Sequence, residues 1–195
     1  MKTLRTNLLL MAIGALIFTA PSCKSKKDAS DEKPEGEELV TVYCSGPEYF
    51  TNQEFFRANA VGESMDQMTS KRKAMSAARE EMANNMETTM SVVTDDHVQS
   101  TEYNNKEEIT EVFNSLARTT TQQTLRGVRT ICEKQTRTAE GRYKTYIAIE
   151  LSADELLTDY NERLSNDERI RSEYNYERFK ETFEEEMKKH EERSR

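Results

Sequence analysis

The spacing of hydrophobic and polar residues predicts a mixed helix and strand domain. Residues 39–44 are rich in β-branched and aromatic side chains and stop at Ser45, Gly46 and Pro47, so a first strand is expected there. Residues 62–93 predict one long helix, because long side chains recur at three- and four-residue steps. These side chains are Met65, Met68, Arg72, Met75, Arg79, Met82, Met86, Met90 and Val93.

The methionines of this long helix have two interpretations. A soft-metal site or an adaptable binding groove would use methionine, but methionine also simply fills a core, and we favour the core. Arg72 and Arg79 interrupt the stripe, which indicates that its edge reaches solvent.

The second half of the chain predicts a short helix, a hairpin and further helices. The short helix is expected over 107–117, after a polar loop over 95–105, and strands over 123–136 and 142–151 are joined by a turn at 138–141. Gly127 is expected to mark a bulge in the first of these strands. A capping box over 152–155 begins another helix, whose apolar side is Leu156, Leu157, Tyr160 and Leu164.

The last segment, 168–195, is highly charged and helical in pattern. Its thin apolar stripe is formed by Tyr174, Phe179, Phe183 and Met187. The final turns are expected to fray into solvent, with pairing to another subunit as the alternative. The expected fold class is α+β: a small antiparallel sheet packed by a long and a shorter helix over 39–160, with a charged helical tail over 161–195.

The N-terminus predicts export and lipid attachment. A basic start with Lys2 and Arg5 precedes about 13 nearly continuous apolar residues, which is typical of a signal peptide and short for a membrane span. Cys23 follows Ala20, Pro21 and Ser22, an arrangement that resembles the relaxed lipobox of Bacteroidetes lipoproteins. The resemblance implies cleavage after residue 22 and lipid on Cys23; the alternative is a secretory leader with an incidental cysteine.

Composition agrees with a modest domain on a tether. Residues 23–38 are charged and contain Pro34 and Gly36, which predicts a disordered tether. Basic residues directly after Cys23 favour the periplasmic face of the outer membrane, by comparison with surface-exported lipoproteins. The full chain has 28 basic and 36 acidic residues, so its net charge of −8 disfavours binding to nucleic acid.

The middle of the chain resembles the Lpp-twenty type family of outer-membrane lipoproteins. The resemblance runs over about 43–151 and rests on four features: a short strand followed by Gly62-Glu-Ser, the helix over 73–83, the segment 124–131, and the tyrosine-rich strand over 143–151. It implies an α+β domain with a structural or assembly role in the envelope, and it brings no catalytic residues.

Candidate chemistry is sparse. His97 and His190 lie in a polar loop and a charged tail by pattern, so both are expected at the surface, and no enzymatic activity, cofactor or metal site is predicted. Cys44 and Cys132 would form a disulfide in an oxidising compartment, or remain reduced and buried; the sequence leaves both open.

These observations favour a membrane-anchored envelope lipoprotein that acts as a structural or interaction module. Its expected partners are the membrane, through Cys23, and envelope proteins, with a homo-oligomer as one form. The alternative is a module that binds a small ligand between the long helix and the sheet.

Overall fold

The computed structural model describes Gly36 and residues 40–194, apart from Asn104 and Glu173. The predicted leader, Cys23 and all of the predicted tether except Gly36 lie outside the described residues. The chain divides into two units, Met1–Val40 and Thr41–Arg195. Every helix and strand below belongs to the second unit.

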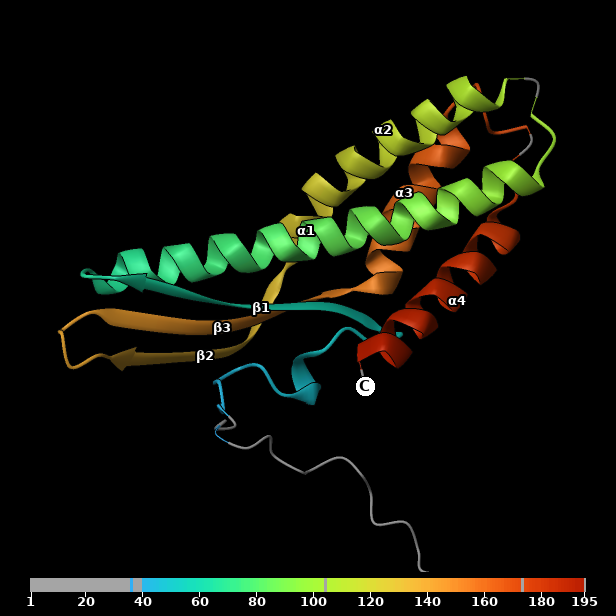
Figure 1. Ribbon diagram of the computed structural model, residues 1–195. Helices are drawn as coiled ribbons and strands as arrows, with labels where there is room; N and C mark the ends of the chain where they lie inside the picture. The colour runs from blue at the N-terminus through green and yellow to red at the C-terminus, as the bar shows by residue number, and fades with distance from the viewer. Residues whose placement is uncertain (1–35, 37–39, 104, 173, 195) are drawn as a thin grey trace, which may run out of the picture. The chain divides into compact units, whose positions relative to one another are not determined.

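The second unit is an α+β fold, which confirms the predicted fold class (Figure 1). A three-stranded antiparallel sheet lies under the first part of a long helix. Two further helices pack on the remainder of that helix, and a third packs mainly on one of those two. In chain order the elements are η1 (Pro47–Tyr49), β1 (Phe55–Ser64), α1 (Gln67–Ser100), α2 (Lys106–Thr124), η2 (Leu125–Gly127), β2 (Arg129–Arg137), β3 (Tyr143–Ser152), α3 (Ala153–Asn166) and α4 (Tyr176–Ser194).

The predicted hairpin is present, and its second strand is the centre of the sheet. The strand order is β1-β3-β2, with both neighbours antiparallel to β3. Alternation along β3 works as predicted: Ile147, Ile149 and Leu151 are buried on the face that α1 covers. The β2 register shifts between Thr130 and Cys132, whereas Gly127 lies in η2, so the predicted bulge was misplaced.

Small residues allow α1 to approach the sheet closely. The Asp66 carboxylate caps the helix by accepting the backbone N–H of Thr69 at 2.7 Å. Ala74 and Ala78 are fully buried. A Cβ added to Gly62 of β1 would lie 2.3 Å from the Ser70 carbonyl oxygen, so this crossing requires glycine.

The rest of the core lies where α1 meets α2 and α4, and where α3 packs on α2. β3 leads directly into α3, where the Ser152 hydroxyl accepts the N–H of Glu155 at 3.3 Å, as the capping pattern predicted. The Tyr160 hydroxyl donates to the Phe113 carbonyl at 2.8 Å and ties α3 to α2. The apolar side chains of the three later helices are buried: Ile109, Val112, Phe113, Leu156, Leu157, Leu164, Phe179, Phe183 and Met187.

Three predictions in the first half were wrong. The long helix was expected from Gly62, but residues 62–64 belong to β1 and α1 begins at Gln67. The described residues of 39–44 form no strand; they belong to an irregular segment in which Cys44 has a positive φ of 57°. The first strand is instead β1. Its sequence pattern is weak because small residues, Ala58 and Ala60, face α1 while polar residues alternate with them. The polar stretch 95–100, predicted as loop, continues α1 because packing on later helices stabilises it.

The C-terminal segment differs from a frayed tail. The helix begins at Tyr176, and Phe179, Phe183 and Met187 are buried against the core, so α4 belongs to the same unit as the sheet. Glu186 is also buried, with Lys189 and Arg193 in ion-pair contact at 3.4 and 2.8 Å. Its carboxylate therefore has the countercharges that burial requires.

Candidate functional site

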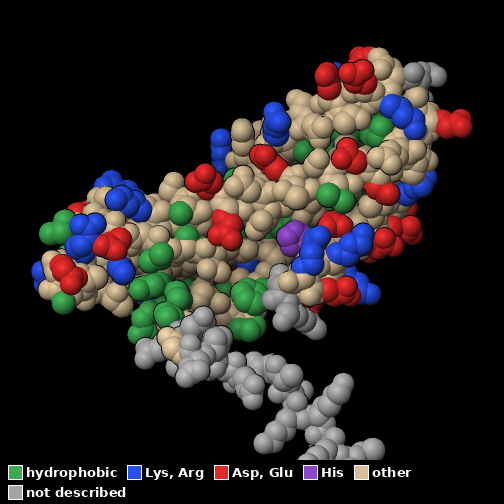
Figure 2. All heavy atoms as spheres, viewed as in Figure 1, with side chains coloured by type: hydrophobic (Ala, Val, Ile, Leu, Met, Phe, Trp, Pro, Cys, Tyr) green, Lys and Arg blue, Asp and Glu red, His purple; other side chains and the backbone are tan. Residues whose placement is uncertain are grey.

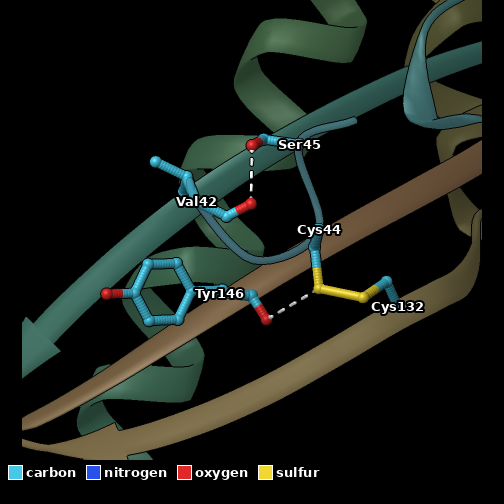
Figure 3. The surroundings of a disulfide bond; sticks show 5 residues. All are labelled: Val42, Cys44, Ser45, Cys132 and Tyr146. Atoms are coloured by element: carbon cyan, nitrogen blue, oxygen red, sulfur yellow. Dashed lines mark hydrogen bonds between the residues drawn. A yellow bond between two sulfur atoms is a disulfide. The ribbon is translucent and has the colours of Figure 1, made fainter. Parts of the chain in front are cut away.

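A disulfide joins the sheet to the chain segment that precedes β1. We call residues 41–52 the N-terminal arm. Cys44 is bonded to Cys132 of β2, with Cα atoms 5.6 Å apart (Figure 3). Cys44 Sγ lies 3.7 Å from the Tyr146 carbonyl oxygen, a van der Waals contact because a bridged sulfur has no proton to donate. The arm is held at its other end by Thr51, whose hydroxyl exchanges two hydrogen bonds with the Arg57 backbone at 2.9 and 3.1 Å.

The strand register shows which face of the sheet the arm occupies. Cys132 pairs with Ala148, which points away from the Ile147 and Ile149 side chains under α1. The arm thus lies on the face opposite α1, which we call the outer face (Figure 1). Ala148 is fully buried on this face. The disulfide and arm therefore take the place of a second helical layer over part of the sheet.

The outer face carries an exposed apolar group, the outer-face patch, formed by Val42, Tyr43, Val61 and Tyr146. The exposed fractions are 43% for Val42, 55% for Tyr43 and 53% for Val61. The Tyr43 and Tyr146 rings meet edge to face with centroids 5.4 Å apart, and Val61 pairs with Tyr146 across the strands. Three elements therefore converge here: the arm, β1 and β3.

An ion-pair network flanks the outer-face patch. Glu150 of β3 accepts from Arg57 at 3.2 Å and from Arg129 at 3.0 Å, so one carboxylate links all three strands. The Arg57 guanidinium lies 5.3 Å from the centroid of the Phe55 ring. Both oxygens of Glu150 are used in these bonds, so its role here is to fix the sheet.

His97 is buried, which corrects the prediction of a surface position. It sits in α1 among the rings of Phe113, Tyr174 and Phe179, with centroid distances of 5.6 to 5.8 Å. Neither ring nitrogen has a hydrogen-bond partner among the described residues. Burial lowers the pKa of His97, the nearby Arg178 lowers that pKa further, and Asp96 raises it. An imidazole enclosed in this way cannot reach a substrate in solvent.

His190 lies on α4 and is half-buried, which also differs from a solvated tail. Burial and the charge of Arg193 lower its pKa, while Glu186 raises it. Within the described part of the chain, no group of three or more His, Cys, Asp or Glu side chains is placed to hold a metal ion. None of the described helices has a run apolar enough to cross a membrane.

The methionine stripe divides into two parts. Met82, Met86 and Met90 are fully buried and fill the core, whereas Met65 and Met68 are 65% and 62% exposed. The space between α1 and the sheet is filled by buried side chains, among them Ala74 and Ile147. The geometry therefore lends no support to a small ligand held between that helix and the sheet.

No family model, characterised protein or solved structure matches this chain. The outer-face patch was not identified from the sequence, although alternation in 143–151 already places Tyr146 opposite the core-facing residues. Its partner Val61 was assigned to no strand, and Tyr43 was placed in a strand that does not form.

Proposed function

We propose that this protein is a lipid-anchored envelope protein of the Lpp-twenty type whose domain binds another envelope protein through the outer-face patch. Its location would be the outer membrane, facing the periplasm. The observation that carries the proposal is the exposed patch of Val42, Tyr43, Val61 and Tyr146 on a face held in shape by a disulfide.

The physical character of the patch supports protein binding. Tyrosine is enriched at protein interfaces because it offers a large rigid surface with a polar end. The arm that carries Tyr43 is fixed at Cys44, so binding would cost little additional ordering of the backbone. The patch is small, which fits a local contact within a larger assembly.

The predicted cellular location supports the same role. The apolar leader and the relaxed lipobox before Cys23 indicate export with lipid attachment. A disulfide between Cys44 and Cys132 suits an oxidising compartment outside the cytoplasm.

Metabolic labelling tests the anchor. Cells expressing the chain are grown with a fatty-acid analogue, and the protein is isolated with and without Cys23→Ala. We expect label on the unmodified chain and none on the variant. Equal labelling of both chains, or of neither, would disprove attachment at Cys23.

Cross-linking in native membranes tests the patch. The double variant Tyr43→Ser, Val61→Thr removes apolar surface at exposed positions while keeping a β-branched residue in the strand. Val92→Thr, at an exposed position of α1 far along the chain from the patch, is the matched control. We expect the same cross-linked proteins from the unmodified chain and the control, and their depletion from the double variant. Identical sets from all three chains would rule out binding through the patch.

A further inference from the structure

The apolar stripe of α1 is covered along only part of its length. With 34 residues the helix is about 51 Å long, whereas α2 has 19 residues and reaches about 28 Å. Figure 1 shows α2 beside the C-terminal part of α1, while the N-terminal part of α1 has the sheet on one side only. The buried methionines from Met82 onward lie in the covered part.

The uncovered part forms an apolar groove with a basic rim. We call it the methionine groove: Met68, Lys71, Arg72, Met75, Ser76 and Arg79. It adjoins Ala74 and Ala78, which face the sheet, so it occupies a flank of the helix. Met65, one residue before the N-cap, extends the exposed apolar surface toward the start of the helix.

Charge is distributed unevenly along the molecule, and the methionine groove lies in its basic part. Residues 57–79 and 126–150 contain eleven Lys and Arg against five Asp and Glu. Residues 80–125 contain two Lys and Arg against nine Asp and Glu. Figure 2 shows mainly basic side chains at the hairpin end of the sheet, with a few acidic ones among them, and acidic and basic side chains together over the helical end.

Only some of this basic charge is neutralised within the fold. Glu133 pairs with Lys71 at 2.9 Å, and Glu63 pairs with both Arg142 and Lys144. Arg72 donates to the uncharged Thr69 hydroxyl. Asp66 lies within electrostatic range of Arg72, and Glu150 pairs with Arg57 and Arg129. The eleven basic residues of these two segments still outnumber their five acids. The groove therefore combines the exposed thioether of Met68 with a net positive charge.

We propose that the methionine groove docks on an anionic phospholipid surface. Met65 and Met68 would enter the headgroup region, and Arg72 and Arg79 would lie along it with their charged ends at phosphate groups. Long basic side chains favour this arrangement because their stems bury apolar area while their ends stay hydrated. The acidic helical end is repelled from the same surface, so the charge distribution also fixes the orientation of the domain.

This inference deepens the proposed function, because lipid on Cys23 would bring the domain to such a surface. Seventeen residues separate Cys23 from Thr41, and even a fully extended chain of that length spans at most about 60 Å. Docking through this flank of α1 would leave the outer face uncovered by the bilayer, since α1 and the outer face lie on opposite sides of the sheet. The patch on that face would then be available to a protein partner.

Vesicle co-sedimentation tests docking without the anchor. The probe is phosphatidylcholine vesicles prepared with and without phosphatidylglycerol, and the protein is the chain from residue 23 onward carrying Cys23→Ser. We expect binding only to the anionic vesicles, weakening as salt rises from about 0.1 M to about 1 M because the Debye length falls from about 10 Å to about 3 Å. Failure to bind the anionic vesicles would overturn the proposal, and so would equal binding to both kinds.

Two groove variants and one control locate the contact. Arg72→Glu with Arg79→Glu should weaken binding at least about tenfold, because each reversal removes an attraction and adds a repulsion. Met65→Ser with Met68→Ser should weaken it with the net charge unchanged. Arg171→Glu with Lys188→Glu makes the same charge change at exposed positions of the helical end and should leave binding unaltered. Equal losses in the groove and control variants would show a net-charge effect and refute the site.

Sedimentation equilibrium distinguishes the competing occupant, a second copy of the chain. The contrary result is a protein that self-associates, loses that association in the groove variants and shows no binding to vesicles. That result would refute docking on lipid and would assign the groove to an acidic helical face of another copy. Because the tested chain carries no lipid, its result is independent of fatty-acid labelling at Cys23. Each proposal can therefore fail while the other stands.

Discussion

Acid should destabilise this protein through His97. The side chain is fully buried among aromatic rings, and its ring nitrogens have no hydrogen-bond partner among the described residues. Burial lowers the pKa of the folded-state imidazole, and Arg178 on α4 lowers it further, although Asp96 on α1 opposes them. In the unfolded chain the pKa should return to about 6.5.

The sign and size follow from proton binding in the two states. Above about pH 6.5 the imidazole is neutral in both states and contributes no pH dependence. Below that pH the unfolded chain binds a proton that the folded chain does not. The free energy of unfolding should fall by up to about 1.4 kcal/mol per pH unit while the folded imidazole stays neutral. Between about pH 6.5 and pH 5 the loss reaches up to about 2 kcal/mol.

Urea unfolding of the unmodified chain and His97→Leu measures this loss. Leucine has a similar volume and does not titrate, so the difference in pH slope between the two proteins isolates His97 from the carboxylates. We expect the unmodified chain to lose more stability on acidification than the variant. His190→Leu should alter the slope less, because His190 is only half-buried.

Equal pH slopes for the unmodified chain and His97→Leu would refute this reasoning. So would a steeper slope in the variant, since the neutral side chain cannot take up a proton on unfolding.

Three further predictions concern stability. Cys44→Ala with Cys132→Ala, or reduction, should cost about 4–5 kcal/mol by the loop-entropy model for a separation of 88 residues, measured by urea unfolding. Gly62→Ala should cost about 1–3 kcal/mol or more in the same assay, because its Cβ would meet backbone atoms of α1. Phe179→Ala should cost about 3–5 kcal/mol by calorimetry, because Phe179 is fully buried.

Each of these has its own contradicting result. Free thiols titrated in the unreduced protein would exclude the Cys44–Cys132 bridge. Gly127→Ala, where the added Cβ would lie 3.1 Å from the flexible Glu155 side chain, is the control for Gly62→Ala; equal costs would contradict a specific close approach of α1. An unchanged melting temperature for Phe179→Ala would place α4 outside the core.

Strong local patterns were sufficient to predict several elements. The alternation in β3, the turn before it and the Ser152 cap all depend on neighbours within a few residues. The stripe of Phe179, Phe183 and Met187 was also visible, but the sequence could not show that its partner is α1 of the same chain. An apolar stripe on a helix indicates that this face is buried, but it does not show which other element it packs against.

The site was less predictable than the fold, because it depends on which strands are neighbours. The cysteines were noticed, and their pairing was left open, since it depends on the arm crossing the outer face. His97 was misplaced because its surroundings in sequence are polar, whereas its surroundings in space are aromatic rings from α2, the segment before α4 and α4 itself.

The sequence by itself determined the class of fold, the hairpin and the Ser152 cap, because each follows from residue type and short-range spacing. Only the tertiary structure decided which half of the α1 methionine stripe is covered. That outcome depends on where α2 ends and the chain turns into β2, which leaves Met65 and Met68 exposed beside basic side chains and buries Met82 and Met86. Long-range packing, which a linear pattern does not encode, separates the core from the surface here.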